Sequence, residues 1–401
     1  MKKVFIVAAK RTAVGSFLGS LKNVHPADLG AALVKDVLGS TKLTGKEIDE
    51  VIFGNILSAG LGQGIARQIA IKGGIDQSVP AYSLNMICGS GMKAVLNAYT
   101  SIGAGVNHLV LAGGVESMSR APFLLNENVR GGMKMGDVVA RDHMLVDALS
   151  DAFNNVHMGI TAENIAEKYQ ITREEQDAFA LDSQLKAIKA VDAGRFDDEV
   201  VPLTVKVGRE EVVFARDEYP NRTTNLEKLA KLRPAFKKDG SVTAGNSSGI
   251  NDGASLLLLA SEEAVAKYKL TPLAEVVSVG QAGVDPLYMG LGPVPAIKKA
   301  LENGKLKLKD MDLIELNEAF ASQSLGVLKE LSAAHNESVE SILKRTNVNG
   351  GAIALGHAVG NSGSRIIVSL IYEMAKQKAK LGLASLCIGG GMGTAIVLKR
   401  V

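Results

Sequence analysis

Short apolar runs alternate with amphipathic segments along the chain. Residues 4–9 and 51–53 are apolar and rich in β-branched side chains, and residues 27–38 carry apolar side chains at helical spacing. Glycine is abundant, with 43 residues, whereas proline is scarce, with 10. This alternation of strand-like and helix-like segments predicts an α/β fold.

One order of segments occurs twice. In each copy a strand-like segment is followed by a glycine-rich turn, a helix, a second strand and a glycine cluster. The first copy comprises residues 48–54, 88–91, 108–112 and 113–114, and the second comprises residues 311–317, 360–363, 384–388 and 389–391. Although α/β segments can resemble one another by chance, the shared order predicts an internal duplication.

Residues 121–244, between the two copies, are more polar and more charged. Thr172 and Glu175 form a capping box, which predicts a helix over 173–193 with Gly194 as its C-cap. One apolar stripe lies along this helix at Ala178, Leu181, Leu185 and Ile188. A basic cluster follows at Lys228, Lys231, Arg233, Lys237 and Lys238. The cluster indicates either a solvated face or a phosphate site on an inserted lid.

Composition argues against several classes of protein. Hydrophobic residues make up 46% of the 401 residues and charged residues 22%, which is typical of a globular chain. The net charge of +3 and the low aromatic content, without tryptophan, argue against nucleic-acid binding. The six histidines and two cysteines lack the spacing of zinc ligands, so we predict no metal site.

The first residues, two lysines and a short apolar run after Met1, mimic a signal peptide. The apolar run is about six residues long, which is too short for a signal, so it predicts a buried strand. No segment approaches the 18 apolar residues of a membrane span, and we expect no membrane association. Two thiols without an export signal indicate a reducing compartment, the cytoplasm.

Cys88 is a candidate nucleophile. It stands in Cys-Gly-Ser-Gly, directly before a helix predicted over 92–101. A thiol at a helix N-terminus faces unpaired N–H groups, which favours the thiolate, and glycines let a substrate approach the backbone. The alternative is a buried, inert cysteine.

Three further residues lie at strand ends or glycine-rich turns. His357 could exchange a proton with a thiol, and Cys387 precedes three glycines whose amides could bind an oxyanion. Asn317 ends a strand predicted over 313–316. Alone, each could be structural: a turn histidine, a core cysteine and a helix cap. Their common position at strand ends of a duplicated α/β core favours a ligand site.

Seven stretches together resemble the thiolase family, most closely its biosynthetic type. They are NMICGSG at 85–91, GGVESMS at 113–119, HMG at 157–159, TAGNSSGINDGA at 243–254, NEAF at 317–320, NGGAIALGH at 349–357 and CIGGGMG at 387–393. The match runs in order over essentially the whole chain.

The resemblance implies a duplicated fold, a five-layer αβαβα sandwich with an inserted loop domain. The N-terminal half would comprise residues 1–120 plus 245–270, the loop domain 121–244 and the C-terminal half 271–401. It also implies a homotetramer. The expected activity is ping-pong Claisen condensation of two acetyl-CoA to acetoacetyl-CoA, and the reverse thiolysis; the CoA thioesters are substrates and no cofactor is expected.

The resemblance also assigns roles. Cys88 would carry the acyl group, His357 would accept its proton and later bind an enolate oxygen with Asn317 through a water, and Cys387 would move a proton at the α-carbon. The backbone N–H groups of Cys88 and Gly389 would hold the thioester oxyanion. The residues expected to contact coenzyme A are His157, Met158, Arg222, Ala244, Ser248, Met289 and Phe320.

Some points depart from the family pattern or stay open. Ala358 replaces the proline that usually follows the catalytic histidine, and residues 333–344 suggest a surface helix extension. Asn221 could take the place of Arg222 toward the phosphates, and a disulfide between Cys88 and Cys387 is neither indicated nor excluded.

Two alternative functions would use similar residues. Ketoacyl or hydroxymethylglutaryl-CoA synthases share the superfamily, but ketoacyl synthases pair the nucleophile with two histidines, so Cys387 favours thiolase. A non-catalytic acyl-CoA-binding protein would be expected to lack Cys88, His357 or Cys387.

Overall fold

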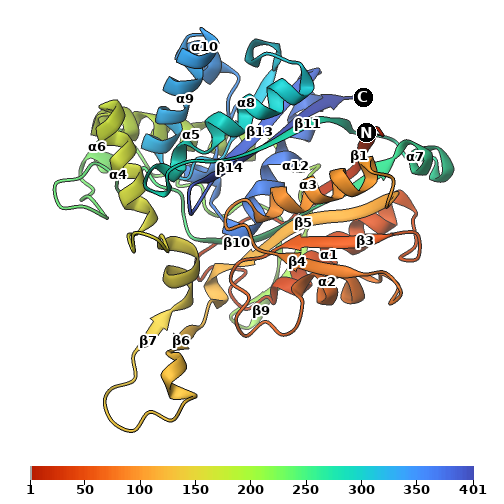
Figure 1. Cartoon of the computed structure of the whole chain (residues 1–401), viewed down its shortest axis with the longest axis horizontal. Helices are drawn as coiled ribbons and strands as arrows, with labels where there is room; N and C mark the ends of the chain where they lie inside the picture. Colours follow the sequence, from red (N-terminus) through yellow and green to blue (C-terminus); the bar gives the residue numbers. More distant parts are fainter. Residues whose placement is uncertain (1) are drawn as a thin grey trace.

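The two copies of the α/β unit form two halves of a ten-stranded sheet in the computed structural model, which describes residues 2–401 (Figure 1). The first half contains β1 (Val4–Arg11), β3 (Glu50–Gly54), β4 (Ala81–Leu84), β5 (Leu109–Ser117) and β10 (Asn251–Ser261), with β2 (Gly15–Ser16) paired to β10. The second half contains β11 (Ala274–Gly283), β12 (Leu313–Leu316), β13 (Leu381–Ile388) and β14 (Met392–Arg400). The strand order is β12-β13-β14-β11-β1-β10-β5-β3-β4.

The strand pairing confirms the duplication. In the first half β3 and β5 are parallel, and β10 and then β1 continue antiparallel. In the second half β12 and β13 are parallel, and β14 and then β11 continue antiparallel. The strands of the two halves are joined where Phe5 and Ile6 of β1 pair with Glu275 and Ala274 of β11.

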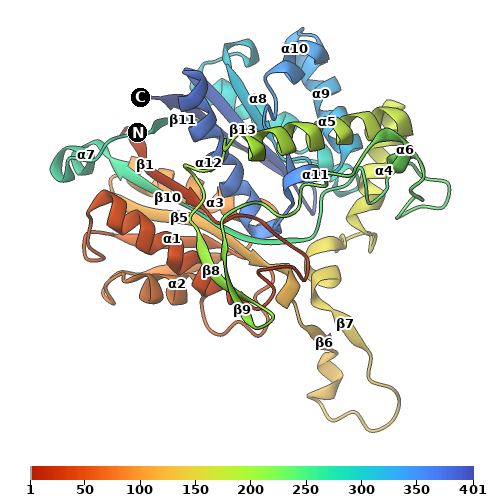
Figure 2. The ribbon, with the colours of Figure 1, turned by 180° about the vertical axis from the view of Figure 1, so that it is seen from behind.

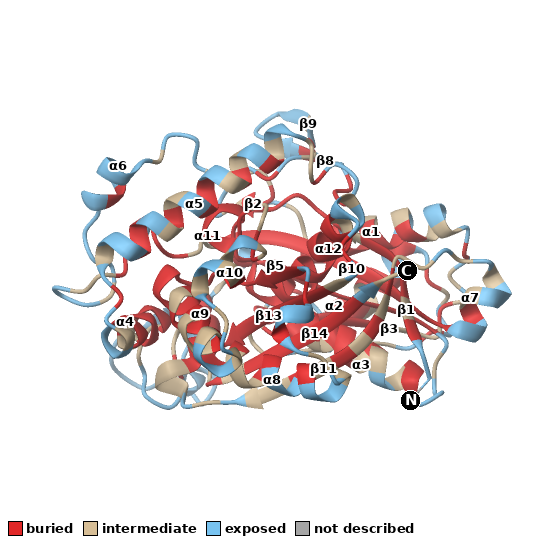
Figure 3. Ribbon diagram, turned by 90° about the horizontal axis from the view of Figure 1, so that it is seen from above, coloured by how far each residue is buried: buried red, intermediate tan, exposed pale blue. Residues whose placement is uncertain are grey.

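Helices and sheets form five layers, as expected. The outer helices α1 (Pro26–Thr41) and α2 (Ile65–Gly73) pack on the first half, and α8 (Pro293–Gly304) and α9 (Ala321–His335) pack on the second. Between the halves lie α3 (Ser90–Gly103) and α12 (Val359–Gln377), whose apolar side chains share one core with strands of both halves. Figure 3 shows α12 almost entirely buried at the centre.

The remaining elements surround these layers. They are β6 (Phe123–Leu125), β7 (Ala140–Asp142), α4 (Met158–Tyr169), α5 (Arg173–Asp192), β8 (Leu203–Val207), β9 (Glu210–Phe214), α6 (Leu226–Ala230), α7 (Glu262–Tyr268), α10 (Val339–Lys344) and α11 (Ala352–Leu355). The β6–β7 hairpin projects away from the layers (Figure 2). None of the helices described between residues 2 and 401 has the length and apolarity to cross a bilayer. The proposed domain boundaries at 120, 244 and 270 stay a prediction.

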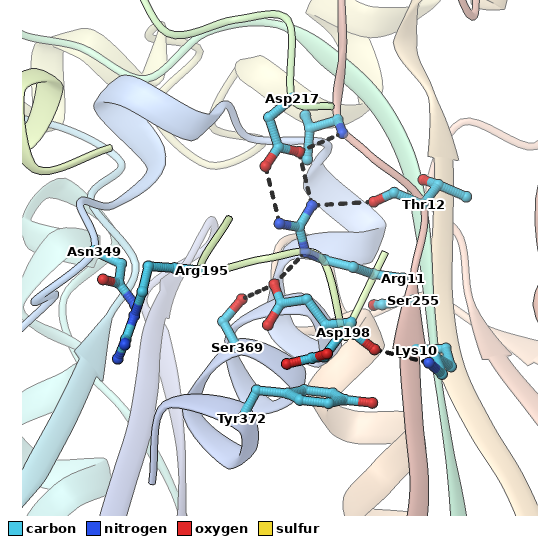
Figure 4. Close-up of polar contacts among 12 residues, drawn as sticks. Lys10, Arg11, Thr12, Arg195, Asp198, Asp217, Ser255, Asn349, Ser369 and Tyr372 are labelled. Carbon is cyan, nitrogen blue, oxygen red and sulfur yellow. Dashed lines mark hydrogen bonds and ion pairs between the residues drawn. The ribbon is translucent and has the colours of Figure 1, made fainter. Parts of the chain in front are cut away.

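A buried ion cluster fixes the inserted segment to the first half. The guanidinium of Arg11 on β1 donates to Glu199 at 2.5 Å and to both oxygens of Asp217 at 2.7 and 2.9 Å (Figure 4). All three side chains are about 1% exposed. Because an unpaired buried charge is costly, these contacts hold the chain around residues 199 and 217 against β1.

Helix α5 has the predicted capping box and length, but its apolar stripe does not face the core. Ala178 and Leu185 are exposed, and Leu181 and Ile188 are half-buried. The buried face is instead polar or small, with Gln176, Asp177, Ala180, Ser183, Gln184, Ala187 and Ala190. The extension at 333–344 is likewise not one helix, because α9 ends at His335 and α10 begins at Val339.

Candidate active site

A cavity of about 470 Å³ lies where the two halves and the inserted segment meet. Nine of the twelve predicted site residues line it: Cys88, His157, Met158, Ala244, Ser248, Met289, Phe320, His357 and Cys387. Cys88 comes from the first half, whereas His357 and Cys387 come from the second. The cavity therefore brings two thiols and an imidazole from distant parts of the chain to one space.

Cys88 lies at the turn that leads into α3. The hydroxyl of Ser90 accepts the N–H of Met86 at 2.8 Å and donates to the carbonyl of Ile87 at 2.6 Å, which closes the turn. Gly89 allows a close approach here, because a Cβ would lie 2.3 Å from the end of the Ile388 side chain, which would have to shift. The Cys-Gly-Ser-Gly turn at 88–91 therefore packs closely against the end of β13.

Burial raises the pKa of Cys88 to about 11. Backbone N–H groups of Gly389 and of Cys88 itself act in the opposite direction, and the carboxylate of Glu116 adds to the rise. The net direction is opposite to the stabilised thiolate expected from the helix N-terminus. Cys88 is therefore a thiol at neutral pH, and it needs a base when it reacts.

His357 precedes α12 as Cys88 precedes α3. Its backbone N–H donates to Asn251 Oδ1 at 2.9 Å, and its ring Nδ1 lies 2.6 Å from Ser362 Oγ. Gly356 before it has φ of 98°, and a Cβ there would lie 2.4 Å from Asn251, so both glycine and asparagine shape the turn. Burial, and then the charge of Arg365, lower the pKa of His357 to about 4. The ring is a neutral imidazole, able to accept a proton.

The buried side chain of Glu116 holds this turn from the first half. Glu116 accepts the N–H of Gly360 at 3.0 Å, in the first turn of α12, whereas Ala358 at the N-cap has no capping side chain. Glu116 also accepts from the Asn55 amide and from the backbone of Ile56 at 2.8 and 3.1 Å. The N-terminus of α12 is thus fixed to the first half of the molecule.

Cys387 also lines the cavity. It ends β13, is 1% exposed and packs with Met158, Met289 and Phe320. Burial and the nearby Cys88 both raise the pKa of its thiol. The next-but-one residue, Gly389, directs its N–H toward the Cys88 sulfur. The backbone N–H groups of Cys88 and Gly389, which are predicted to bind the oxyanion, therefore both point to the Cys88 sulfur.

Asn317 does not line the cavity. It follows β12, is 1% exposed, and its side-chain amide makes no hydrogen bond with residues 2–401. It does not cap α9 either, since the N-cap of that helix is Phe320. The helix-cap alternative is therefore wrong, and both polar atoms of the amide are buried without a hydrogen-bond partner among residues 2–401.

Arg222 lies outside the cavity and is exposed. Its guanidinium forms two hydrogen bonds with Asp192, at 2.9 and 2.5 Å. Arg222 and Asn221 instead line a neighbouring cavity of about 500 Å³. The two cavities share Ser16, Tyr219 and Ala244, so they are adjacent.

The basic cluster is exposed and partly paired. Lys231 contacts Glu227 at 2.5 Å and Lys237 contacts Glu167 at 2.8 Å. Neither cavity is lined by the five basic residues, which favours the solvated face over the phosphate site. Within residues 2–401, no three His, Cys, Asp or Glu side chains are arranged to bind a metal ion.

Sequence reasoning missed an aromatic stack and several positioning groups. The ring of Phe236 stacks on His157 at 4.6 Å and meets Phe320 edge-on at 6.1 Å. A Cβ on Gly159 would lie 2.2 Å from the Phe236 ring, so this glycine admits the stack. No motif marks Phe236, whereas Asn251, Glu116 and Ser362 lie in or beside the stretches that carry the resemblance.

Comparisons with known proteins agree with this geometry. Family models described as "Thiolase, N-terminal domain" and "Thiolase, C-terminal domain" match residues 4–263 and 270–400. Proteins named acetyl-CoA acetyltransferase from Pseudomonas aeruginosa and Syntrophomonas wolfei are 52% and 50% identical, over all of this chain and all of theirs.

Solved structures also match over the whole chain. The Bacillus anthracis acetyl-CoA acetyltransferase has a TM-score of 0.95 at 45% identity, and 99% of it is covered. Human mitochondrial 3-ketoacyl-CoA thiolase in complex with CoA has a TM-score of 0.93 at 44% identity, with 98% covered. The sequence, the layers and the cavity lead to one assignment: this chain belongs to the thiolase family, whose members are acyltransferases.

Proposed function

We propose that the protein is an acetyl-CoA acetyltransferase that condenses two acetyl-CoA to acetoacetyl-CoA and free CoA, and catalyses the reverse thiolysis. The observation that carries the proposal is the single cavity lined by Cys88, His357 and Cys387. Close relatives named for this activity support it. In this arrangement Cys88 can carry the acyl group, and the His357 imidazole and the Cys387 thiolate can each accept a proton.

The first half-reaction acylates Cys88. The thiol sulfur attacks the acetyl carbonyl while its proton passes to His357, because the raised pKa of the thiol disfavours a free thiolate. The N–H groups of Cys88 and Gly389 bind the oxyanion. The bond between the acyl carbon and the CoA sulfur breaks, and the leaving sulfur takes the proton of Cys387. Free CoA then departs, which makes the kinetics ping-pong.

The second half-reaction forms the carbon–carbon bond. The Cys387 thiolate removes a proton from the α-carbon of a second acetyl-CoA. The enolate oxygen receives hydrogen bonds from the protonated His357 and from a water held by Asn317. The carbanion attacks acyl-Cys88, and the departing Cys88 sulfur regains its proton from His357. All three groups return to their starting protonation states.

The cavity also suits the pantetheine arm of CoA. Ala244 and Ser248 line it, and Ala244 also lines the neighbouring cavity, whereas Met289 and Phe320 belong to the apolar cluster around Cys387. Met158 beside the stacked His157 would limit the acyl group to a short one. Arg222 at the neighbouring cavity would bind CoA phosphates. The CoA thioesters serve as substrates, and no cofactor is invoked.

Assembly into a homotetramer is part of the proposal. Around the β6–β7 hairpin, Phe123, Met135 and Val139 are 68%, 93% and 63% exposed. Large exposed apolar groups on a projecting segment are typical of a protein–protein interface, which supports contact with further copies of the chain. The free thiols Cys88 and Cys387 fit a reducing compartment, and a cytoplasmic location remains a prediction.

The experiment is to incubate the protein with acetyl-CoA, quench it in acid and analyse its peptides by mass spectrometry. We expect an acetyl group on the Cys88 peptide, and acetoacetyl-CoA in the supernatant. Cys88→Ala should abolish both without unfolding the protein, because one thiol contributes little to so large a core. Normal thiolysis by that variant would refute the assignment. An unmodified Cys88 under these conditions would favour a binding protein without catalysis.

A further inference from the structure

The ring of His357 has one close polar partner among the described residues, the hydroxyl of Ser362. The distance from Nδ1 to Oγ is 2.6 Å, and the two residues are 6% and 1% exposed. Ser362 lies in the first turn of α12, five residues after His357. This hydrogen bond is therefore buried, and it joins the residue before the N-cap of α12 to the first turn of the same helix.

Proton counting links the two contacts of the Ser362 hydroxyl. A serine hydroxyl carries one proton, and Ser362 Oγ also lies 3.1 Å from the carbonyl oxygen of Ala358, which can only accept. If the hydroxyl donates to Ala358, it must accept from His357, and Nδ1 then carries the hydrogen. Nε2 is left with a free lone pair. The opposite arrangement would place the hydrogen on Nε2, which could not then accept a proton.

The choice matters because His357 is neutral. Burial and the charge of Arg365 lower its pKa, and a neutral imidazole has one N–H and one acceptor nitrogen. The backbone on either side is already fixed, by Asn251 at His357 N and by Glu116 at Gly360 N. The backbone contacts therefore fix the position of the turn, whereas the contact with Ser362 is the one that reaches the ring itself.

We propose that Ser362 is a positioning residue that holds His357 as the Nδ1–H tautomer, so that Nε2 takes the proton of Cys88. This inference rests on the proposed function. When Cys88 attacks the acyl carbon, its proton moves to Nε2, and the resulting imidazolium keeps its Nδ1–H on Ser362 Oγ. The Ser362 hydroxyl keeps its own proton throughout and continues to donate it to the Ala358 carbonyl oxygen. Nε2–H is then the donor to the enolate oxygen in the second half-reaction.

The first test measures the tautomer directly, in the free protein labelled with ¹⁵N-histidine. His357→Asn identifies the signals of this residue among the six histidines. We expect Nδ1 to resonate as a protonated nitrogen and Nε2 as an unprotonated one. A protonated Nε2 with an unprotonated Nδ1 would overturn the proposal. Because no substrate is present, this result is independent of whether the protein transfers acetyl groups.

The second test is the single-turnover rate of Cys88 acylation by acetyl-CoA. Loss of a residue that orients a functional histidine slows the reaction by about 10- to 100-fold in metal sites, and we expect a loss in that range for Ser362→Ala, with KM little changed. Ser362→Thr keeps the hydroxyl and should restore most of the rate. Acylation of Ser362→Ala at the wild-type rate would overturn the proposal.

A matched control removes another buried serine hydroxyl from the same helix. Ser369 Oγ donates to Glu199 at 2.9 Å (Figure 4), and Ser369 does not line the cavity. Ser369→Ala should leave the acylation rate and the His357 ¹⁵N signals unchanged. An equal rate loss in both variants would assign the effect of Ser362 to helix packing and refute its role in the tautomer. Failure of the wild-type protein to form acyl-Cys88 would refute the proposed function instead.

Discussion

Cys88 should react slowly with alkylating agents in the free protein, although it is the proposed nucleophile. Alkylation by iodoacetamide requires the thiolate. The pKa of Cys88 is about 11, against 9.0 for an unperturbed thiol, so the thiolate fraction near neutral pH is lower by a factor of about 100. At pH 7 roughly one molecule in 10⁴ carries the thiolate.

The assay follows carbamidomethylation of the Cys88 peptide by mass spectrometry from pH 6 to pH 10. The sign of the pKa shift predicts a rate that rises about tenfold per pH unit without a plateau below pH 10. Cys387→Ser removes the second thiol from the measurement. His357→Asn should change the rate little, because His357 accepts the proton only as the acyl bond forms.

A fast rate that is independent of pH between 6 and 8 would refute this reasoning. It would show a thiolate–imidazolium pair formed in advance, as the position of Cys88 before a helix suggests. In that case His357→Asn would also slow alkylation strongly, since the pair would be lost. The same two measurements therefore separate a base that acts during the attack from one that acts before it.

Three further changes test other parts of the site. Cys387→Ala should still form acyl-Cys88 but lose condensation; equal loss of both steps, measured by peptide mass and acetoacetyl-CoA yield, would contradict separate roles. Ala358→Pro should raise the free energy of unfolding by about 0.4–1 kcal/mol, because φ is −72° and the Ala358 N–H makes no hydrogen bond within residues 2–401; a lower urea midpoint would contradict this. Gly159→Ala should lower the free energy of unfolding, since overpacking against Phe236 costs about 1–3 kcal/mol and better helix propensity returns only about 1 kcal/mol; a raised urea midpoint would contradict it.

The main elements could be predicted because local patterns and burial agree in them. The first strand, expected at 4–9, runs from Val4 to Arg11, and the helix expected at 27–38 runs from Pro26 to Thr41. The strand at 313–316 has the predicted bounds. In such elements the apolar positions are the buried ones, so periodicity reports directly on the core.

Helix α5 shows where that reasoning fails. Its buried face makes hydrogen bonds to the scaffold of the site instead of apolar contacts. Asp177 accepts from the Asn246 amide at 2.9 Å, and Ser183 donates to Glu318 at 2.6 Å. Because the polar face of α5 is the one that packs against the protein, Leu185 on another face is 56% exposed. Hydrophobic periodicity cannot identify a face that is buried through hydrogen bonds.

The protonation states of the site were also beyond the sequence. A helix N-terminus lowers the pKa of a nearby thiol, but the burial of Cys88 depends on residues distant in the chain, such as Ile388. The same holds for His357, whose pKa depends on burial and on Arg365. Motifs identify which residues take part, whereas the surrounding fold determines the form in which they react.

The equivalence of the two halves has a consequence for how such a site can arise. Gly89 is the N-cap of α3 and Ala358 the N-cap of α12, so Cys88 and His357 occupy the same place relative to their helices. Two copies of one turn, packed across a shared layer, hold a sulfur and a nitrogen at the same cavity. A single exchange of side chain in one copy of an ancestral repeat is then enough to convert a pair of identical groups into a donor and its acceptor.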